Sequence, residues 1–168
     1  MLLVQGALFW AGVLFLIASA FDMLDGALAR ARQMSSQFGA FLDSTIDRYS
    51  EILVFMGLLI FFQRAAADPT LYSVLIFLSV NGSLMTSYVR ARAESLGFDG
   101  RGGLLERPER VIILGLGMIS GWTIISLWLL AILTNLSALQ RCVNVWQQSR
   151  GGGAKQPKLP AAEQGNPG

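Results

Sequence analysis

The 168-residue sequence contains no histidine, a single cysteine (Cys142) and few charged residues, and each shortage limits the chemistry open to the chain. Without histidine, a Ser–His or Cys–His nucleophile is excluded, so proton transfer has to use a carboxylate, a tyrosine or a lysine. A single cysteine allows no disulfide within the chain, and without histidine it leaves no plausible set of zinc ligands.

The shortage of charge is typical of a membrane protein. Only 14% of the residues are charged and 53% are hydrophobic, and the mean hydropathy is +0.51. A helix crosses the hydrocarbon layer with about 20 mostly apolar residues. Uncharged stretches of at least that length occur at 1–21, 69–89 and 111–139, and 39–63 is also long enough but carries several charges. Ionisable groups in a membrane segment are costly and usually functional, so we expect a functional site in the charged segment 39–63.

The basic residues predict how the chain is threaded. Only one of the 13, Arg64, lies in the 63–68 connection, whereas most others fall between the first two segments, between Arg90 and Arg110, or after Leu139. Positive residues favour the cytoplasmic side. If the basic C-terminal region is also cytoplasmic, the 111–139 stretch has to cross the membrane twice. We therefore expect a break in this stretch near Ser120–Gly121, with a short fourth helix before it. A single long tilted helix is the alternative.

These segments predict an all-α polytopic integral membrane helix bundle with about five spans and an external N-terminus. We place the membrane domain at residues 1–147. The remainder, 148–168, is rich in Gly, Pro, Gln and Ala and is expected to form a disordered cytoplasmic tail.

Four aspartates lie across the junction of the first two segments: Asp22, Asp25, Asp43 and Asp47. Helical residues three or four apart share one face, so they form two pairs. Two facing pairs would make an all-oxygen cage, which suits Mg²⁺ or Mn²⁺. The alternative is that these acids are merely solvated at helix ends.

The spacing resembles that of the CDP-alcohol phosphatidyltransferases. Residues 22–47 match the pattern D-x-x-D-G-x-x-A-R-x8-G-x-x-x-D-x-x-x-D at all eight defining positions. The resemblance implies that the four aspartates bind two divalent metal ions and that the motif holds the pyrophosphate of a CDP-activated lipid. It also implies that Asp47 is the general base for the acceptor hydroxyl, and that the protein is a homodimer.

Three further residues of the motif are candidates for binding the CDP-lipid. Gly26 and Ala29 are small enough to let a phosphate or a nucleobase approach the helix, although small residues also serve tight helix packing. Arg30 offers a bidentate fork to phosphate oxygens.

A second group of residues points to an anionic acceptor. Arg90, Arg110 and Arg141 each lie at the end of a predicted span on the side of the aspartates. Three converging guanidinium groups suit an acceptor that carries its own phosphate. Residues 87–94 and 106–110 resemble the family branch that makes phosphatidylinositol phosphate, which implicates Ser87, Arg90 and Arg110, with Arg141 as a further family arginine. Glu106 and Glu109 are expected to pair with Arg107 or Arg92.

The sequence therefore predicts a transferase of the inner membrane with its site on the cytoplasmic side. It would move a phosphatidyl group from CDP-diacylglycerol to a phosphorylated polyol, in first place inositol phosphate, and release CMP. Phosphatidylglycerophosphate synthases share the scaffold and are the alternative; a non-catalytic relative is a third possibility. A cation carrier is disfavoured because its acids would lie near the bilayer midplane. No nucleic-acid partner is expected. The family has six spans, and since this chain begins where the second would, we expect the family bundle without its first span.

Overall fold

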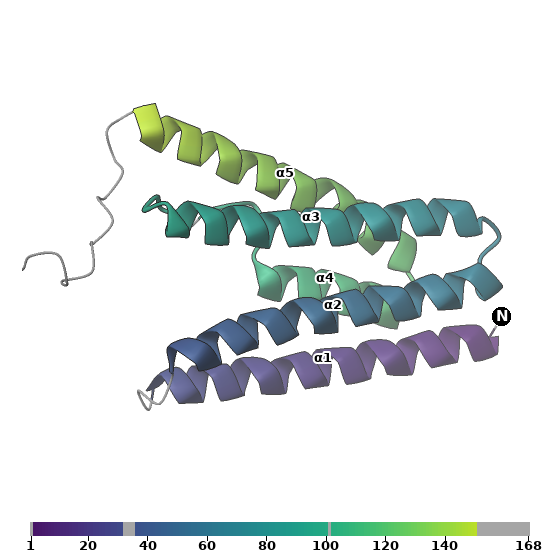
Figure 1. The fold of residues 1–168 in the computed structure, drawn as a ribbon. Helices are drawn as coiled ribbons and strands as arrows, with labels where there is room; N and C mark the ends of the chain where they lie inside the picture. Colours follow the sequence, from purple (N-terminus) through teal and green to yellow (C-terminus); the bar gives the residue numbers. More distant parts are fainter. Residues whose placement is uncertain (1, 32–35, 101, 151–168) are drawn as a thin grey trace, which may run out of the picture.

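The structure is a computed structural model that describes residues 2–31, 36–100 and 102–150, with side chains for 6–25, 36–100 and 102–150. This part of the chain forms a bundle of five helices and contains no strand (Figure 1). The helices are α1 (Leu2–Ala31), α2 (Gln37–Ala65), α3 (Pro69–Ser95), α4 (Arg107–Ser120) and α5 (Thr123–Arg150). The predicted all-α bundle is confirmed.

Each of the middle three helices begins where the sequence supplies a capping group. The Ser36 hydroxyl accepts from the Gly39 N–H at 2.9 Å at the start of α2. The Asp68 carboxylate accepts from the Leu71 N–H at 3.1 Å, and a proline follows it as the first residue of α3. At the start of α4 the Glu109 carboxylate accepts from the Glu106 N–H at 2.9 Å. Such caps satisfy backbone groups that a helix leaves unpaired at its ends.

The predicted break in the 111–139 stretch is confirmed, and the single long helix is wrong. α4 ends at Ser120, and Gly121 follows with a φ of 78°, in the left-handed region that glycine adopts without strain. α5 then runs to Arg150, three residues beyond the position at which we placed the domain boundary. Residues 148–150 are therefore helical and do not belong to a disordered tail.

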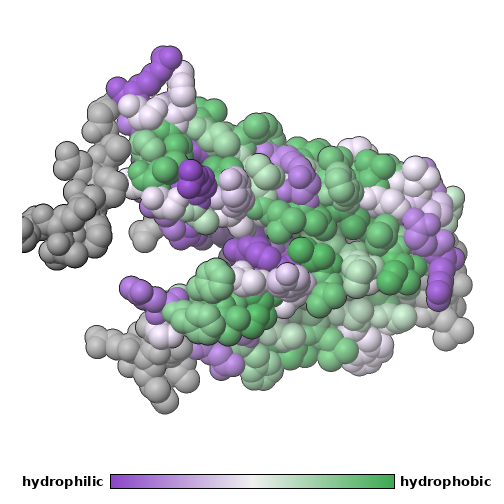
Figure 2. All heavy atoms as spheres, viewed as in Figure 1, coloured by the Kyte–Doolittle hydropathy of each residue, from purple (hydrophilic) through white to green (hydrophobic). Residues whose placement is uncertain are grey.

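Three of the described helices are long and apolar enough to cross a membrane: α1 over Gly6–Asp25, α3 and α5. The other two helices are not of this kind, because α2 carries several charged residues and α4 has only 14 residues. Figure 2 shows hydrophobic side chains over most of the visible face, with hydrophilic ones at the two ends and in a hollow between the helices. This distribution is that of a protein whose sides face lipid.

The largest interface in the described part of the bundle joins α3 and α5. Leu75, Leu127 and Leu130 are almost fully buried there. Gly82 allows the two helices to approach closely, because a Cβ at this position would lie 2.8 Å from the Asn135 backbone nitrogen. Buried hydroxyls in this interface are satisfied by carbonyls one turn earlier, as in the 2.7 Å bond from Thr134 Oγ1 to Leu130 O.

α1 and α2 do not share such an interface. α1 packs mainly on α4, where Gly115 receives the Leu16 side chain, and α2 packs mainly on α3. The two helices that carry the aspartate motif are thus supported by different neighbours, and the site lies where their faces meet near one end of the bundle.

Candidate active site

Three of the four motif aspartates converge. Asp22 comes from α1, and Asp43 and Asp47 come from successive turns of α2. One carboxylate oxygen of each lies within 4.8 Å of the others. The side chains of Asp22 and Asp43 are exposed, whereas that of Asp47 is only 12% exposed. Asp25 is exposed on α1 and does not belong to this group.

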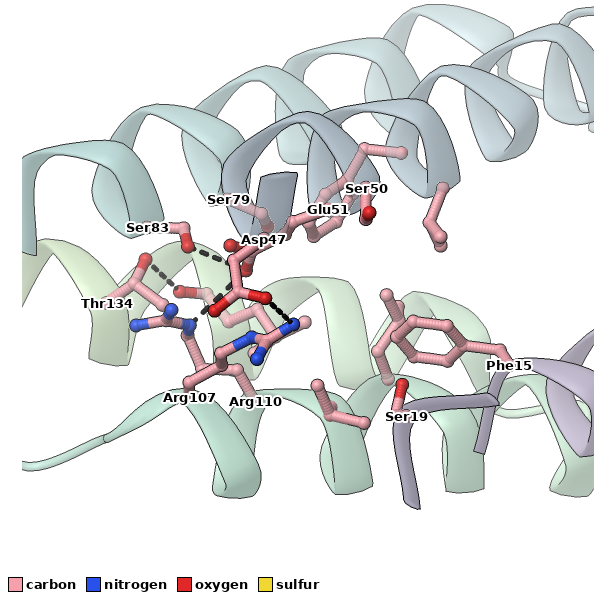
Figure 3. A pocket seen from close by; sticks show the side chains of 15 residues that line it. Phe15, Ser19, Asp47, Ser50, Glu51, Ser79, Ser83, Arg107, Arg110 and Thr134 are labelled. Atoms are coloured by element: carbon pink, nitrogen blue, oxygen red, sulfur yellow. Dashed lines mark hydrogen bonds and ion pairs between the residues drawn. The ribbon is translucent and has the colours of Figure 1, made fainter. Parts of the chain in front are cut away.

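The guanidinium of Arg107, the first residue of α4, pairs with two of these carboxylates, and Figure 3 shows it beside Asp47. Its Nη1 is 3.0 Å from Asp22 Oδ2, and its Nη2 is 2.7 Å from Asp47 Oδ1. One side chain from α4 therefore joins α1 to α2. The expectation that Glu106 and Glu109 pair with Arg107 or Arg92 is wrong. Among the described residues neither glutamate forms an ion pair: Glu109 caps α4, and Arg107 pairs with Asp22 and Asp47.

The donor set fits a divalent metal ion. Three carboxylates converge, and all the ligand atoms are oxygens, which hard cations such as Mg²⁺ and Mn²⁺ prefer. A single guanidinium shared by two of the carboxylates leaves the group with excess negative charge. This charge favours binding of a cation.

Glu51 lies one turn beyond Asp47 on α2 and forms the centre of a second, buried group of polar side chains. Its Oε1 accepts a 2.6 Å hydrogen bond from the Ser83 hydroxyl on α3 and lies 3.3 Å from Arg110 Nε on α4. The side chain of Arg110 is 5% exposed and that of Glu51 is 17% exposed. Glu51 is not among the site residues expected from the sequence, although its position four residues after Asp47 places both on one helical face.

The arginines expected to hold the acceptor phosphate divide into two buried ones and one at the rim. Arg141 is 4% exposed, donates from Nη1 to Thr86 O at 3.1 Å, and lies within electrostatic range of Arg90 and Arg110. Arg90 is more exposed and pairs with Glu94 at 3.0 Å. The three guanidinium groups therefore gather at one end of the bundle.

Ser87 is oriented differently from the expectation. Its hydroxyl donates to Ser83 O, one turn earlier in α3, at 3.1 Å. It lines a separate hollow between α2 and α3, together with Arg48 and Tyr88. In this structure Ser87 does not point toward the group around Glu51.

A small cavity of about 50 Å³ lies between Asp47 and the group around Glu51. Asp47, Glu51, Arg107 and Arg110 line its polar side, and Phe15 lies on its apolar side (Figure 3). This volume holds only a few waters. Since Arg107 crosses from α4 to both α1 and α2, that side chain has to move before a larger molecule can enter.

Several buried polar atoms in this region have no hydrogen-bond partner within the described part of the chain. They are Arg48 Nη1, Glu51 Oε2, Arg110 Nε and Arg141 Nε. Arg110 Nε is close to Glu51 but is not aligned for a hydrogen bond. Leaving such groups unpaired costs stability, so each has bonding capacity that a bound ligand or water can use.

The remaining residues of the motif cannot be placed in the site. The backbones of Gly26, Ala29 and Arg30 belong to the last turns of α1. Their side chains lie outside the described residues.

The sequence is similar to proteins of known family. The family model described as CDP-alcohol phosphatidyltransferase matches residues 1–139. The phosphatidylinositol phosphate synthase of Mycobacteroides abscessus is 41% identical over 143 residues, which cover 81% of this chain and 64% of the relative. The archaetidylinositol phosphate synthase of Methanothermobacter thermautotrophicus is 41% identical over 144 residues, which cover 82% of this chain and 70% of the relative. The chain thus spans just under two thirds of the first of these proteins.

Solved structures of the Mycobacterium tuberculosis phosphatidylinositol phosphate synthase have the same fold. The structure with CDP-DAG bound has a TM-score of 0.76 and 37% sequence identity, and the match covers 87% of this chain and 77% of that one. The structure in complex with manganese and citrate also has a TM-score of 0.76 and 37% identity, with 85% and 72% covered.

Proposed function

The chain belongs to the CDP-alcohol phosphatidyltransferase family, and we propose that it transfers a phosphatidyl group from CDP-diacylglycerol to inositol phosphate and releases CMP. The observation that carries the proposal is that Asp47, which converges with Asp22 and Asp43, lines one cavity together with the buried guanidinium of Arg110. A carboxylate group suits the metal-bound pyrophosphate of a CDP-lipid, and a buried arginine suits the phosphate of the acceptor.

The reaction is a substitution at phosphorus. The oxygen of an acceptor hydroxyl bonds to the lipid-side phosphorus of CDP-diacylglycerol, and the bond from that phosphorus to the CMP oxygen breaks. Asp47 takes the proton of the hydroxyl, because it belongs to the converging carboxylates and lines the cavity. Arg110 and Arg141, with Arg90 at the rim and Ser87 after a change of rotamer, hold the phosphate of the acceptor. Gly26, Ala29 and Arg30 hold the CDP-lipid.

Two divalent ions, Mg²⁺ or Mn²⁺, are assigned to Asp22, Asp25, Asp43 and Asp47. When bound, such ions neutralise charge on the phosphoryl oxygens and align the displacement. The convergence of three of these carboxylates supports the assignment, as does the manganese in the related solved structure. Asp25 would complete the set by rotating toward the others from the next turn of α1.

The names of the relatives favour inositol phosphate over glycerol phosphate as the acceptor. The two relatives are named for different lipids, phosphatidyl and archaetidyl, but both names contain inositol phosphate. Phosphatidylglycerophosphate synthesis remains the second candidate because it also needs an anionic acceptor. A cation carrier is not favoured, since the carboxylates adjoin several arginines.

The chain is an integral membrane protein of three long apolar helices and two shorter or more polar ones. We place it in the inner membrane with the aspartates and arginines on the cytoplasmic side, because most of its basic residues lie at that end of the bundle. A membrane domain that extends to the end of α5 at Arg150, a cytoplasmic tail after it, and a homodimer complete the proposal.

The experiment is a CMP-release assay on the chain in nanodiscs with Mg²⁺ and CDP-diacylglycerol. Inositol 1-phosphate, glycerol 3-phosphate, inositol and serine are added singly. The proposal predicts release with inositol 1-phosphate above all others. Release with glycerol 3-phosphate alone would establish the second candidate, and release with unphosphorylated inositol or serine alone, or with none of the four, would contradict both.

A further inference from the structure

Glu51 connects the two halves of the site but has no role in the proposed reaction so far. It lies on α2 four residues after Asp47, and both side chains line the same cavity (Figure 3). It contacts α3 through Ser83 and α4 through Arg110. A carboxylate shielded from water in this way is costly unless its charge is compensated.

The two oxygens of Glu51 have different surroundings. Oε1 accepts from the Ser83 hydroxyl at 2.6 Å and faces Arg110 Nε at 3.3 Å. Oε2 is buried and has no hydrogen-bond partner within the described residues. Oε1 therefore holds the arginine in place, while Oε2 is an acceptor atom with its bonding capacity unused.

A carboxylate oxygen at this place suits one kind of ligand group. It repels phosphate, and Glu51 does not belong to the group of carboxylates that converge within 4.8 Å at the metal position. What remains is a hydrogen-bond donor on a molecule that enters between Asp47 and Arg110. An acceptor whose phosphate binds Arg110 and whose reacting hydroxyl reaches Asp47 brings further hydroxyls to this position.

We infer that Glu51 is a specificity residue of the acceptor site: its Oε1 fixes Arg110 for the acceptor phosphate, and its Oε2 accepts a hydrogen bond from a non-reacting hydroxyl of the polyol. This inference rests on the proposed function, since it assumes a phosphorylated polyol as acceptor. It identifies the substrate class by a second chemical feature, the hydroxyl, beside the phosphate. A site that hydrogen-bonds a hydroxyl rejects analogues that lack it, because its own polar group is then left unpaired.

The test measures steady-state CMP release by the Glu51→Gln chain in nanodiscs, with inositol 1-phosphate and CDP-diacylglycerol varied in turn. Glutamine keeps the size of the side chain and removes the charge. The KM for the acceptor should rise roughly tenfold or more, as expected for loss of a charge-assisted hydrogen bond, while the KM for the lipid changes less than about twofold. Equal effects on both substrates, or none on either, would overturn the inference.

Acceptor analogues test the hydroxyl contact separately from any structural role. The analogues are inositol phosphates in which one hydroxyl at a time is replaced by hydrogen. The wild-type protein should use one of these analogues poorly, whereas the Glu51→Gln protein should use that analogue as well as inositol 1-phosphate. If both proteins discriminate identically against every analogue, the contact to Oε2 does not exist. Ser83→Ala, which removes the hydroxyl bound to Oε1, is the second variant and should raise the acceptor KM by a smaller factor.

Asp68→Asn is the matched control for the loss of one carboxylate. Asp68 caps α3 through its side-chain oxygen, and asparagine caps a helix equally well, so neither KM should change. The wild-type protein distinguishes failure of the proposed function from failure of the inference about Glu51. If the proposed function is wrong, the wild-type protein releases no CMP with inositol 1-phosphate. An active wild type with unaltered Glu51→Gln kinetics would refute the inference about Glu51 alone.

Discussion

Arg107 Nη2 lies 2.7 Å from Asp47 Oδ1, so the carboxylate proposed as general base is paired with a guanidinium from another helix. The same guanidinium reaches Asp22 on α1 at 3.0 Å. A positive side chain thus contacts two of the carboxylates that the family motif assigns to a metal ion. The ion pair and the metal compete for the same oxygens, which leads to the first prediction.

Arg107→Ala should tighten Mn²⁺ binding several-fold, because a competing cation is removed from Asp22 and Asp47. Mn²⁺ affinity in detergent, read by electron paramagnetic resonance, measures this directly. Arg92→Ala is the control: it removes an arginine that is exposed on α3. Weaker Mn²⁺ binding by the Arg107 variant would mean that the guanidinium is needed to hold the carboxylates together.

Asp47→Asn should reduce turnover by roughly a hundredfold or more, the usual contribution of a general base, while the protein still binds CDP-diacylglycerol. Asparagine has nearly the same shape but cannot take a proton at neutral pH. Single-turnover CMP release and equilibrium binding of the lipid separate the two effects. A variant with near-normal turnover would exclude Asp47 as the base.

Arg110→Ala should raise the KM for inositol 1-phosphate far more than the KM for CDP-diacylglycerol. It should also lower the thermal stability, because Glu51 is left buried without its partner. Arg150→Ala is the control, since this guanidinium stacks on Trp146 at the far end of α5. Kinetics are compared only for variants that elute as a single species in detergent, and an equal rise in both KM values would remove Arg110 from the acceptor site.

Gly82→Ala should destabilise the bundle by about 1–3 kcal/mol, because the added methyl group meets Thr134 and the α5 backbone. Thermal unfolding in detergent should show a lower midpoint. Gly57→Ala on α2 is the matched control: nothing lies within 4 Å of a Cβ there, so its midpoint should not fall. Equal midpoints for the two variants would contradict the close approach of α3 and α5.

The helices could be predicted from the sequence because their signals are local. The break after Ser120 follows from Gly121, whose left-handed conformation ends α4, and the start of α3 follows from Asp68 with the proline after it. Hydropathy alone indicates α1 and α3, whereas the division of the 111–139 stretch into α4 and α5 also needs the placement of the basic residues, and α2 carries the charges of the site. The predicted domain boundary at residue 147 falls three residues before the end of α5, because residues 148–150 are polar yet helical.

The site could be predicted only as far as helical periodicity reaches. Asp43 and Asp47 share a face because they are four residues apart, but the pairing of Arg107 with Asp22 joins residues 85 positions apart. No local pattern reveals such a contact. Glu51 shares the helical face of Asp47, four residues earlier, but its partners Ser83 and Arg110 come from two other helices, and no local pattern indicates those contacts.

The mass of the lipid product tests the central claim most directly. The chain in nanodiscs is incubated with Mg²⁺, CDP-diacylglycerol and inositol 1-phosphate, and the lipids are analysed by mass spectrometry. The account predicts a new lipid that contains the diacylglycerol, the inositol and two phosphorus atoms, because the hydroxyl attacks and the acceptor keeps its phosphate beside Arg110. A product with one phosphorus atom, or no inositol-containing lipid at all, would contradict it.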